Sequence, residues 1–188
     1  LTTVAWRLNK KMSFALDGGI YITGAATQWL RDGIKIINSA SETEQMAYDA
    51  GSNGGVYFVP AFSGLAAPHW DSYARGTMVG ITGGTTREHI VRATLESTAY
   101  QVKDNLDVMN MDASMPITVL RADGGAAANK FLMQFQADLI GIPVDVPEIK
   151  DTTALGAAQL AALGAGEFDS IEQMEGTWKL AKRYEPKM

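Results

Sequence analysis

The chain has 188 residues, of which 46% are hydrophobic and 20% charged, and its formal net charge is −5. This length suits one ordinary domain, and this balance of apolar and charged residues is sufficient for a buried core. Basic residues are scattered or occur in short pairs such as Lys10 and Lys11. Because such a surface does not attract phosphate polymers, we expect no nucleic-acid partner and no membrane partner.

Cysteine is absent, which excludes a disulfide framework, a thiolate zinc site and a cysteine nucleophile. No apolar run is long enough to span a bilayer, and residues 1–8 do not resemble a signal peptide, so we expect a cytoplasmic location. The two histidines, His69 and His89, have no cysteine and no paired acidic helper nearby in the sequence, and we expect no metal site. Because Leu1 opens directly on strand-like sequence, we expect a fragment whose fold begins upstream.

The first half of the chain predicts a hairpin, two helices and two strands. Residues 1–6 and 13–16 are rich in β-formers and flank a polar turn, which indicates an antiparallel hairpin. Apolar side chains recur at helical spacing over residues 23–37 and predict a helix there. A short helix, a glycine-rich turn and two strands are then expected at residues 42–49, 51–55, 56–59 and 76–81.

The second half predicts alternating strands and helices. Thr85 and Glu88 have the spacing of a capping box and open a helix that runs to about Asn110. A strand, a helix, a strand and an Ala/Gly-rich helix packed closely on the sheet are expected at residues 117–122, 129–140, 144–146 and 153–163. We therefore expect one α/β domain over residues 1–188, in which a mixed sheet starts with the antiparallel hairpin and continues in βαβ units covered by helices. This order of elements is found in ribonuclease-H-like ATPase domains of the actin and hexokinase type.

Two glycine corners are candidates for a ligand site. Asp123, Gly124 and Gly125 follow a predicted strand, where a flat purine could lie against backbone without Cβ atoms, and Asn129 offers an amide one turn later. By themselves these residues also fit a tight turn and a helix cap, and they favour that plainer alternative.

The second corner is formed by Gly24 and Gln28, at the start of the first helix and on one face of it. A helix amino-terminus attracts anions, and a glycine there leaves room for a phosphate or a ribose. The alternative is an ordinary helix start with Gln28 in solvent. The two corners share the pattern Gly-x-x-x-amide and could form opposite walls of one cleft.

Residues 76–96 resemble the second signature of the FGGY carbohydrate kinases. The match consists of a Gly-Thr-Met-Val-Gly-Ile run, a seven-residue gap and the run from His89 to Glu96. Within that family, the chain is most similar to the glycerol kinase group over several further segments, at residues 60–76, 120–129, 131–136, 152–158 and 184–186.

This resemblance implies an actin-like enzyme of two domains with ATP in the cleft between them. Gly24 and Gln28 would lie near the ribose and phosphates, and Gly125 and Asn129 would hold the adenine. The catalytic aspartate of the family and most polyol contacts would lie upstream of residue 1, so no catalytic residue is assigned within the chain. Mg²⁺ would be held mainly through ATP and the amino-terminal domain, which is the expected partner, together with a polyol or sugar substrate and a second copy in a homo-oligomer.

The function that the resemblance implies is the ATP-binding part of a glycerol kinase, which by itself would be inactive. Two alternatives stay open. The complete enzyme could act on another sugar, such as xylulose or gluconate, or the chain could be an actin-like nucleotide-binding module without catalysis.

Overall fold

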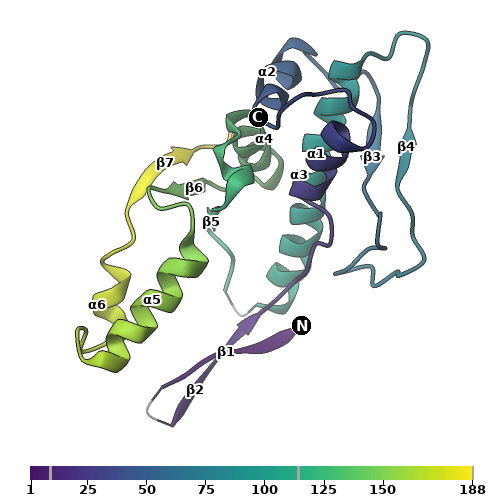
Figure 1. Ribbon diagram of the computed structural model, residues 1–188. Helices are drawn as coiled ribbons and strands as arrows, with labels where there is room; N and C mark the ends of the chain where they lie inside the picture. The colour runs from purple at the N-terminus through teal and green to yellow at the C-terminus, as the bar shows by residue number, and fades with distance from the viewer. Residues whose placement is uncertain (9, 114, 188) are drawn as a thin grey trace.

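A computed structural model describes residues 1–8, 10–113 and 115–187, and Figure 1 shows the order of the elements. The central element is the long helix α3 (Arg87–Asp112), against which α1 (Gly24–Asp32), α2 (Glu42–Asp49) and α4 (Lys130–Ile140) pack. Small and aliphatic side chains of α3, such as the fully buried Ala99, let these neighbours approach closely. Helix α3 therefore sets the relative positions of α2, of α1, which carries Gly24 and Gln28, and of α4, which Asn129 caps.

The first four strands form two separate two-stranded antiparallel sheets. Strands β1 (Thr2–Leu8) and β2 (Lys11–Leu16) form the predicted hairpin, with Val4 opposite Phe14. Strands β3 (Tyr57–Val59) and β4 (Thr77–Val79) form the second pair, which packs on α3 through β3.

The third sheet contains the predicted βαβ unit. Strand β5 (Leu120–Arg121) is parallel to β6 (Val144–Pro147), and α4 connects them and packs on β6. Strand β7 (Leu180–Tyr184), which the sequence did not predict, pairs with β6 in antiparallel direction. The βαβ prediction is thus confirmed for one unit, and the strands are distributed over three small sheets.

The core lies in clusters on either side of α3. Val144 and Val146 of β6 pack against Leu132, Met133 and other side chains of α4. On the other side of α3, Trp29 of α1 stacks on Phe58 of β3, with 5.6 Å between ring centroids. Burial of each such large side chain contributes about 1.5–3 kcal/mol, so these clusters hold α1, α3 and α4 together.

The first helix is shorter than predicted. It ends at Asp32, and Gly33 and Ile34 both donate their amides to the carbonyl of Trp29. Lys35 then adopts a left-handed conformation with φ 56°, which turns the chain. The turn places Ile37, 4% exposed, in a cluster with Leu30, Met46 and Val91. The helical spacing of Ile37 thus reflects burial in a loop instead of a continuing helix, and Ile34 is exposed.

The cap of α3 lies one residue later than predicted. Thr86 occupies the cap position, and its backbone amide donates to Nδ1 of His89 over 3.0 Å. Thr85 instead accepts from the amide of Thr82 over 2.9 Å. Glu88 lies beside Arg87, whose hydrogen bond is the main reason that the pKa of this carboxyl falls to about 2. The histidine ring therefore does the capping that the sequence assigned to the glutamate.

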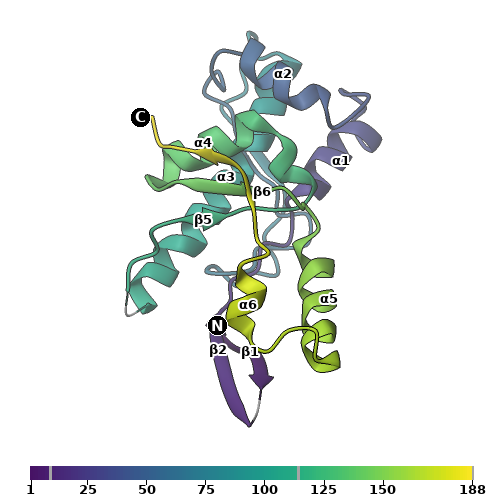
Figure 2. The same cartoon turned by 90° about the vertical axis from the view of Figure 1, so that its left-hand side faces the viewer.

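The last predicted helix does not pack on the sheet. Helix α5 (Thr152–Ala165) contains no buried residue, and Figure 2 shows it standing apart from α4 and β6, followed by α6 (Ile171–Glu175). Its alanines and glycines each supply little apolar area to drive docking, so small side chains alone do not bring the helix onto the sheet. None of the helices in the described part of the chain has the length and apolar character needed to cross a membrane.

Candidate functional site

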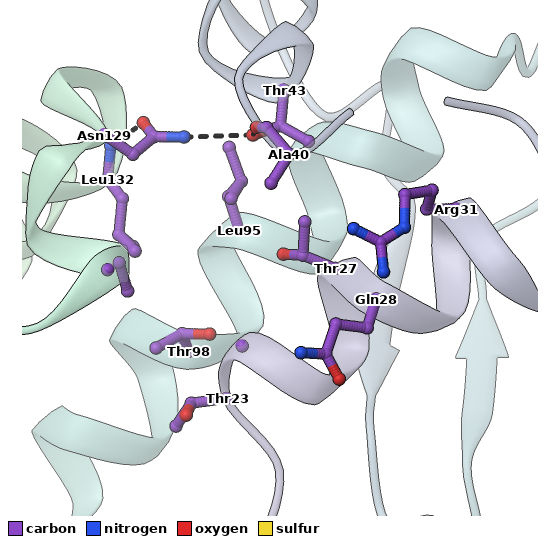
Figure 3. A pocket seen from close by; sticks show the side chains of 13 residues that line it. Thr23, Thr27, Gln28, Arg31, Ala40, Thr43, Leu95, Thr98, Asn129 and Leu132 are labelled. Atoms are coloured by element: carbon purple, nitrogen blue, oxygen red, sulfur yellow. Dashed lines mark hydrogen bonds between the residues drawn. The ribbon is translucent and has the colours of Figure 1, made fainter. Parts of the chain in front are cut away.

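A cavity of about 290 Å³ lies between α1, α3 and the turn that precedes α4, with α2 at its rim (Figure 3). All four residues that the sequence singled out line it: Gly24, Gln28, Gly125 and Asn129. The two Gly-x-x-x-amide corners are thus on one cavity, although they are far apart in the sequence.

The first corner places the amino-terminus of α1 at the cavity. Gly24 is the first residue of the helix, and a Cβ built there would meet no heavy atom within 4 Å. Gln28 lies one turn later on the same face of the helix and is exposed. The free amides and dipole of a helix start favour negative charge, so this corner can hold an anionic group.

The second corner is a turn that is tied to the start of α5. Gly124 has φ 78°, a conformation that favours glycine, and its amide donates to the carbonyl of Lys150 over 2.8 Å. The carboxylate of Asp123 accepts from the amide of Thr152 over 3.3 Å. Gly125 differs from Gly124 in that its φ is not left-handed, while an added Cβ would enter open space at both glycines. The backbone at Gly125 therefore needs no glycine for its shape, and its missing side chain leaves the cavity open.

Asn129 caps α4 and also lines the cavity, so the two alternatives that the sequence left open do not exclude each other. As the cap of α4, its Oδ1 accepts from the amide of Leu132 over 3.0 Å. Its Nδ2 donates to Oγ1 of Thr43 over 3.1 Å, and the side chain also lines the cavity. An amide has two N–H groups and two lone pairs, so one donor and one acceptor are left for a ligand. Capping and ligand binding are thus compatible.

Among the cavity residues that the sequence did not predict, Thr43 is the one that bonds to Asn129. It lies on α2, 86 residues before Asn129, and is only 1% exposed. No local pattern in the sequence connects the two residues, because their contact arises from the packing of α2 against α4. A threonine in the first turn of a short helix carries no signal of its own.

The cavity is almost uncharged. Among its described lining residues only Arg31 carries a charge, and its guanidinium is paired with Asp32 over 2.7 and 2.8 Å. The hydrogen bond from Arg31 lowers the pKa of the Asp32 carboxyl. Hydroxyl groups and apolar side chains complete the lining, with Thr27, Thr98, Leu95 and Leu132 among them. Apolar walls with a few polar groups suit a flat ligand with a polar edge.

The lining offers means of binding and no acid–base group. Its described residues include no carboxylate and no histidine, and no group of three or more His, Cys, Asp or Glu in the described ranges could hold a metal ion. What this arrangement can do chemically is to position a ligand.

Comparison with known proteins identifies the relatives of this chain. The family model for the carboxy-terminal domain of the FGGY family of carbohydrate kinases matches residues 2–165. Glycerol kinase 2 of Thermotoga maritima is 58% identical over 188 residues, which cover 100% of this chain and 38% of that protein.

Solved structures agree with this relationship. Plasmodium falciparum glycerol kinase, solved with ADP, superimposes with a TM-score of 0.88 at 38% identity, over 100% of this chain and 38% of that one. Xylulose kinase of Lactobacillus acidophilus has a TM-score of 0.79 at 22% identity, over 95% of this chain and 36% of that one, and supports the fold alone. The predicted ribonuclease-H-like, actin-type α/β fold is confirmed.

The chain spans 38% of the length of the glycerol kinases that it matches. A family model that covers residues 2–165, together with high identity along the whole chain, shows that this chain belongs to the FGGY family of carbohydrate kinases and corresponds to its carboxy-terminal domain.

Proposed function

We propose that this chain is the ATP-binding part of a kinase that transfers the γ-phosphoryl group of ATP to glycerol. The observation that carries the proposal is the convergence of Gly24, Gln28, Gly125 and Asn129 on one cavity. The high identity to a glycerol kinase and the presence of ADP in the Plasmodium structure support it.

In this proposal the two corners hold opposite ends of the nucleotide. The adenine lies against the bare backbone of Gly125, and its polar edge meets the free donor and acceptor of Asn129. The ribose and phosphates extend toward Gly24 and Gln28, where the start of α1 favours negative charge. The walls of the cavity thus match the chemistry of the two ends.

The remaining machinery belongs to the rest of the protein. Because the described lining contains no carboxylate, the base that accepts the proton of the glycerol hydroxyl has to come from the amino-terminal domain, which closes over the nucleotide and excludes water. Mg²⁺ would be held by the phosphates of ATP and by carboxylates of that domain. One domain over residues 1–188 is a proposal that rests on the length and composition of the chain, and a cytoplasmic location is one that rests on its sequence character. A homo-oligomeric state is a proposal that rests on the family resemblance.

The adenine site is tested by two substitutions in the complete protein. Gly125→Val and Asn129→Ala should each weaken ATP binding, measured by isothermal titration calorimetry, by about 1–3 kcal/mol. Gly83→Val is the matched control, because an added Cβ at Gly83 also enters open space, but Gly83 does not line the cavity. Unchanged ATP affinity in both cavity variants would sink the assignment.

The choice of acceptor is tested on the same protein. Phosphorylation rates with glycerol, xylulose and gluconate should favour glycerol, and a preference for either sugar acceptor would contradict the proposal. The isolated 188-residue chain should be inactive, because the proposed base lies outside it. Glycerol phosphorylation by that isolated chain at the rate of the complete enzyme would refute the assignment of the base to the amino-terminal domain.

A further inference from the structure

The hydrogen bonds around Asn129 determine which way its amide faces. The amide of Leu132 can only donate, so the atom it meets over 3.0 Å has to be the oxygen, Oδ1. The nitrogen, Nδ2, is left on the other side of the group, 3.1 Å from Oγ1 of Thr43. The orientation therefore follows from the partners of the amide.

Thr43 can only accept from Asn129. Its single hydroxyl proton is donated to the carbonyl of Ala40 over 2.7 Å, so Oγ1 offers a lone pair to Nδ2. Because Thr43 is only 1% exposed, bulk water does not compete for this contact. A rotated amide would place its oxygen against a hydroxyl that has no proton to give.

Helix α2, which carries Thr43, is held in place by hydrogen bonds to α3 and to α4. Arg92 of α3 donates to the carbonyl of Ala47, at the far end of α2, over 3.3 Å. At the near end, the carboxylate of Glu44 accepts from the amide of Lys130, the first residue of α4, over 2.7 Å. Thr43 is thus carried by a helix that is hydrogen-bonded to both α3 and α4.

We propose that Thr43 is a positioning residue that locks the amide of Asn129 and thereby sets the selectivity of the cavity for a 6-aminopurine over a 6-oxopurine. This inference rests on the proposed function, in which the base lies at Gly125 and Asn129. The locked amide offers one donor and one acceptor in a fixed order. Adenine presents the complementary pair, the amino group at position 6 beside an unprotonated ring nitrogen.

A 6-oxopurine does not match this order. Hypoxanthine has two acceptors on its N7 edge, so the amide oxygen would face another oxygen or nitrogen lone pair. On its N1 edge the donor and the acceptor are exchanged, which only a rotated amide would fit. Without Thr43, the hydrogen bond from the amide of Leu132 is the one restraint on the Asn129 amide among the described residues, and the amide plane can turn toward such a base.

The test compares ATP with inosine triphosphate as phosphoryl donors for the complete enzyme. In Thr43→Val, which keeps the shape but removes the hydroxyl, KM for ATP should rise about threefold to tenfold. With kcat expected to change by less than about twofold, the preference for ATP over inosine triphosphate in kcat/KM should fall by about threefold or more. Thr43→Ser keeps the hydroxyl and should have the parent KM for ATP and the parent preference for ATP. Thr43→Ala also removes the hydroxyl and replaces the valine variant if that variant does not fold.

Thr94→Val is the matched control. Thr94 is also 1% exposed and its hydroxyl donates to the carbonyl of Ile90 over 2.9 Å, but it does not line the cavity. An unchanged donor preference in the folded valine or alanine variant at position 43 would overturn the inference, as would an equal loss of preference in Thr94→Val. If Asn129→Ala weakens ATP binding while the variants of Thr43 leave the preference intact, only this inference fails. If neither Asn129→Ala nor Gly125→Val weakens ATP binding, the proposed adenine site fails, and this inference fails with it.

Discussion

Replacement of Glu96 by alanine removes one partner of a buried ion pair on α3. The side chain of Glu96 is 3% exposed and that of Arg92 17%, and Nε of the arginine lies 2.7 Å from Oε1 of the glutamate. The second carboxylate oxygen accepts from Nδ2 of Asn53 over 3.0 Å. The substitution therefore leaves a mostly buried guanidinium and a side-chain amide without their acceptor.

The expected loss of unfolding free energy is large. Removal of one partner of a buried pair typically costs about 3–5 kcal/mol, because the remaining charge is uncompensated. Arg92 keeps two other contacts, the carbonyl of Ala47 at 3.3 Å and the ring of Phe131 at 4.9 Å. These contacts favour the lower end of that range, so we expect about 3 kcal/mol.

Urea unfolding followed by circular dichroism measures this loss. Glu88→Ala is the control, because the pair of Glu88 with Arg87 lies at the surface and should contribute less than about 1 kcal/mol. The double variant Arg92→Met with Glu96→Leu should be more stable than Glu96→Ala, since it leaves no buried charge. Equal midpoints for Glu96→Ala and Glu88→Ala would refute the reasoning.

Three further variants probe the sheets and the turn by the same unfolding assay. The hydrogen bond from Arg183 over 2.6 Å lowers the pKa of the Asp145 carboxyl in the folded protein below its ordinary value of 3.8. The ionised pair therefore stabilises the folded state fully above pH 3.8, and this stabilisation is lost as pH falls through the lower folded pKa. Asp145→Asn should therefore lower the midpoint at neutral pH and match the parent in strong acid, and an equal difference at both pH values would contradict this. Gly80→Ala should cost more than about 2 kcal/mol, because φ is +82° and the Cβ would lie 1.9 Å from the carbonyl oxygen of Gly55. Gly124→Ala should cost about 1 kcal/mol through its left-handed φ, and a neutral result would show that the turn relaxes.

Local patterns predicted several elements correctly. The short helix at residues 42–49 has the predicted bounds, and the two β-rich runs pair as the predicted antiparallel hairpin, whose turn includes residue 9, outside the described residues. These elements depend on neighbours in the sequence, namely helical spacing and alternating β-formers around a turn.

Where prediction failed, a distant partner decided the outcome. Ile37 has helical spacing from Leu30 but lies in a loop, because α2 and α3 supply the side chains that bury it. The Ala/Gly-rich α5 has the composition of a packed helix but buries no residue. An apolar side chain gains the same burial in a loop as in a helix, so spacing alone does not separate the two.

The cavity likewise combines features that the sequence predicted and features that only tertiary packing decided. The sequence by itself predicted the four residues Gly24, Gln28, Gly125 and Asn129, through a glycine and an amide one turn later and through the family resemblance. Only the tertiary structure decided that they share one cavity and that Thr43 holds the amide of Asn129. The physical reason is that backbone shape and helix caps arise within a few residues, whereas a hydrogen bond across 86 residues exists only after α2 and α4 have packed.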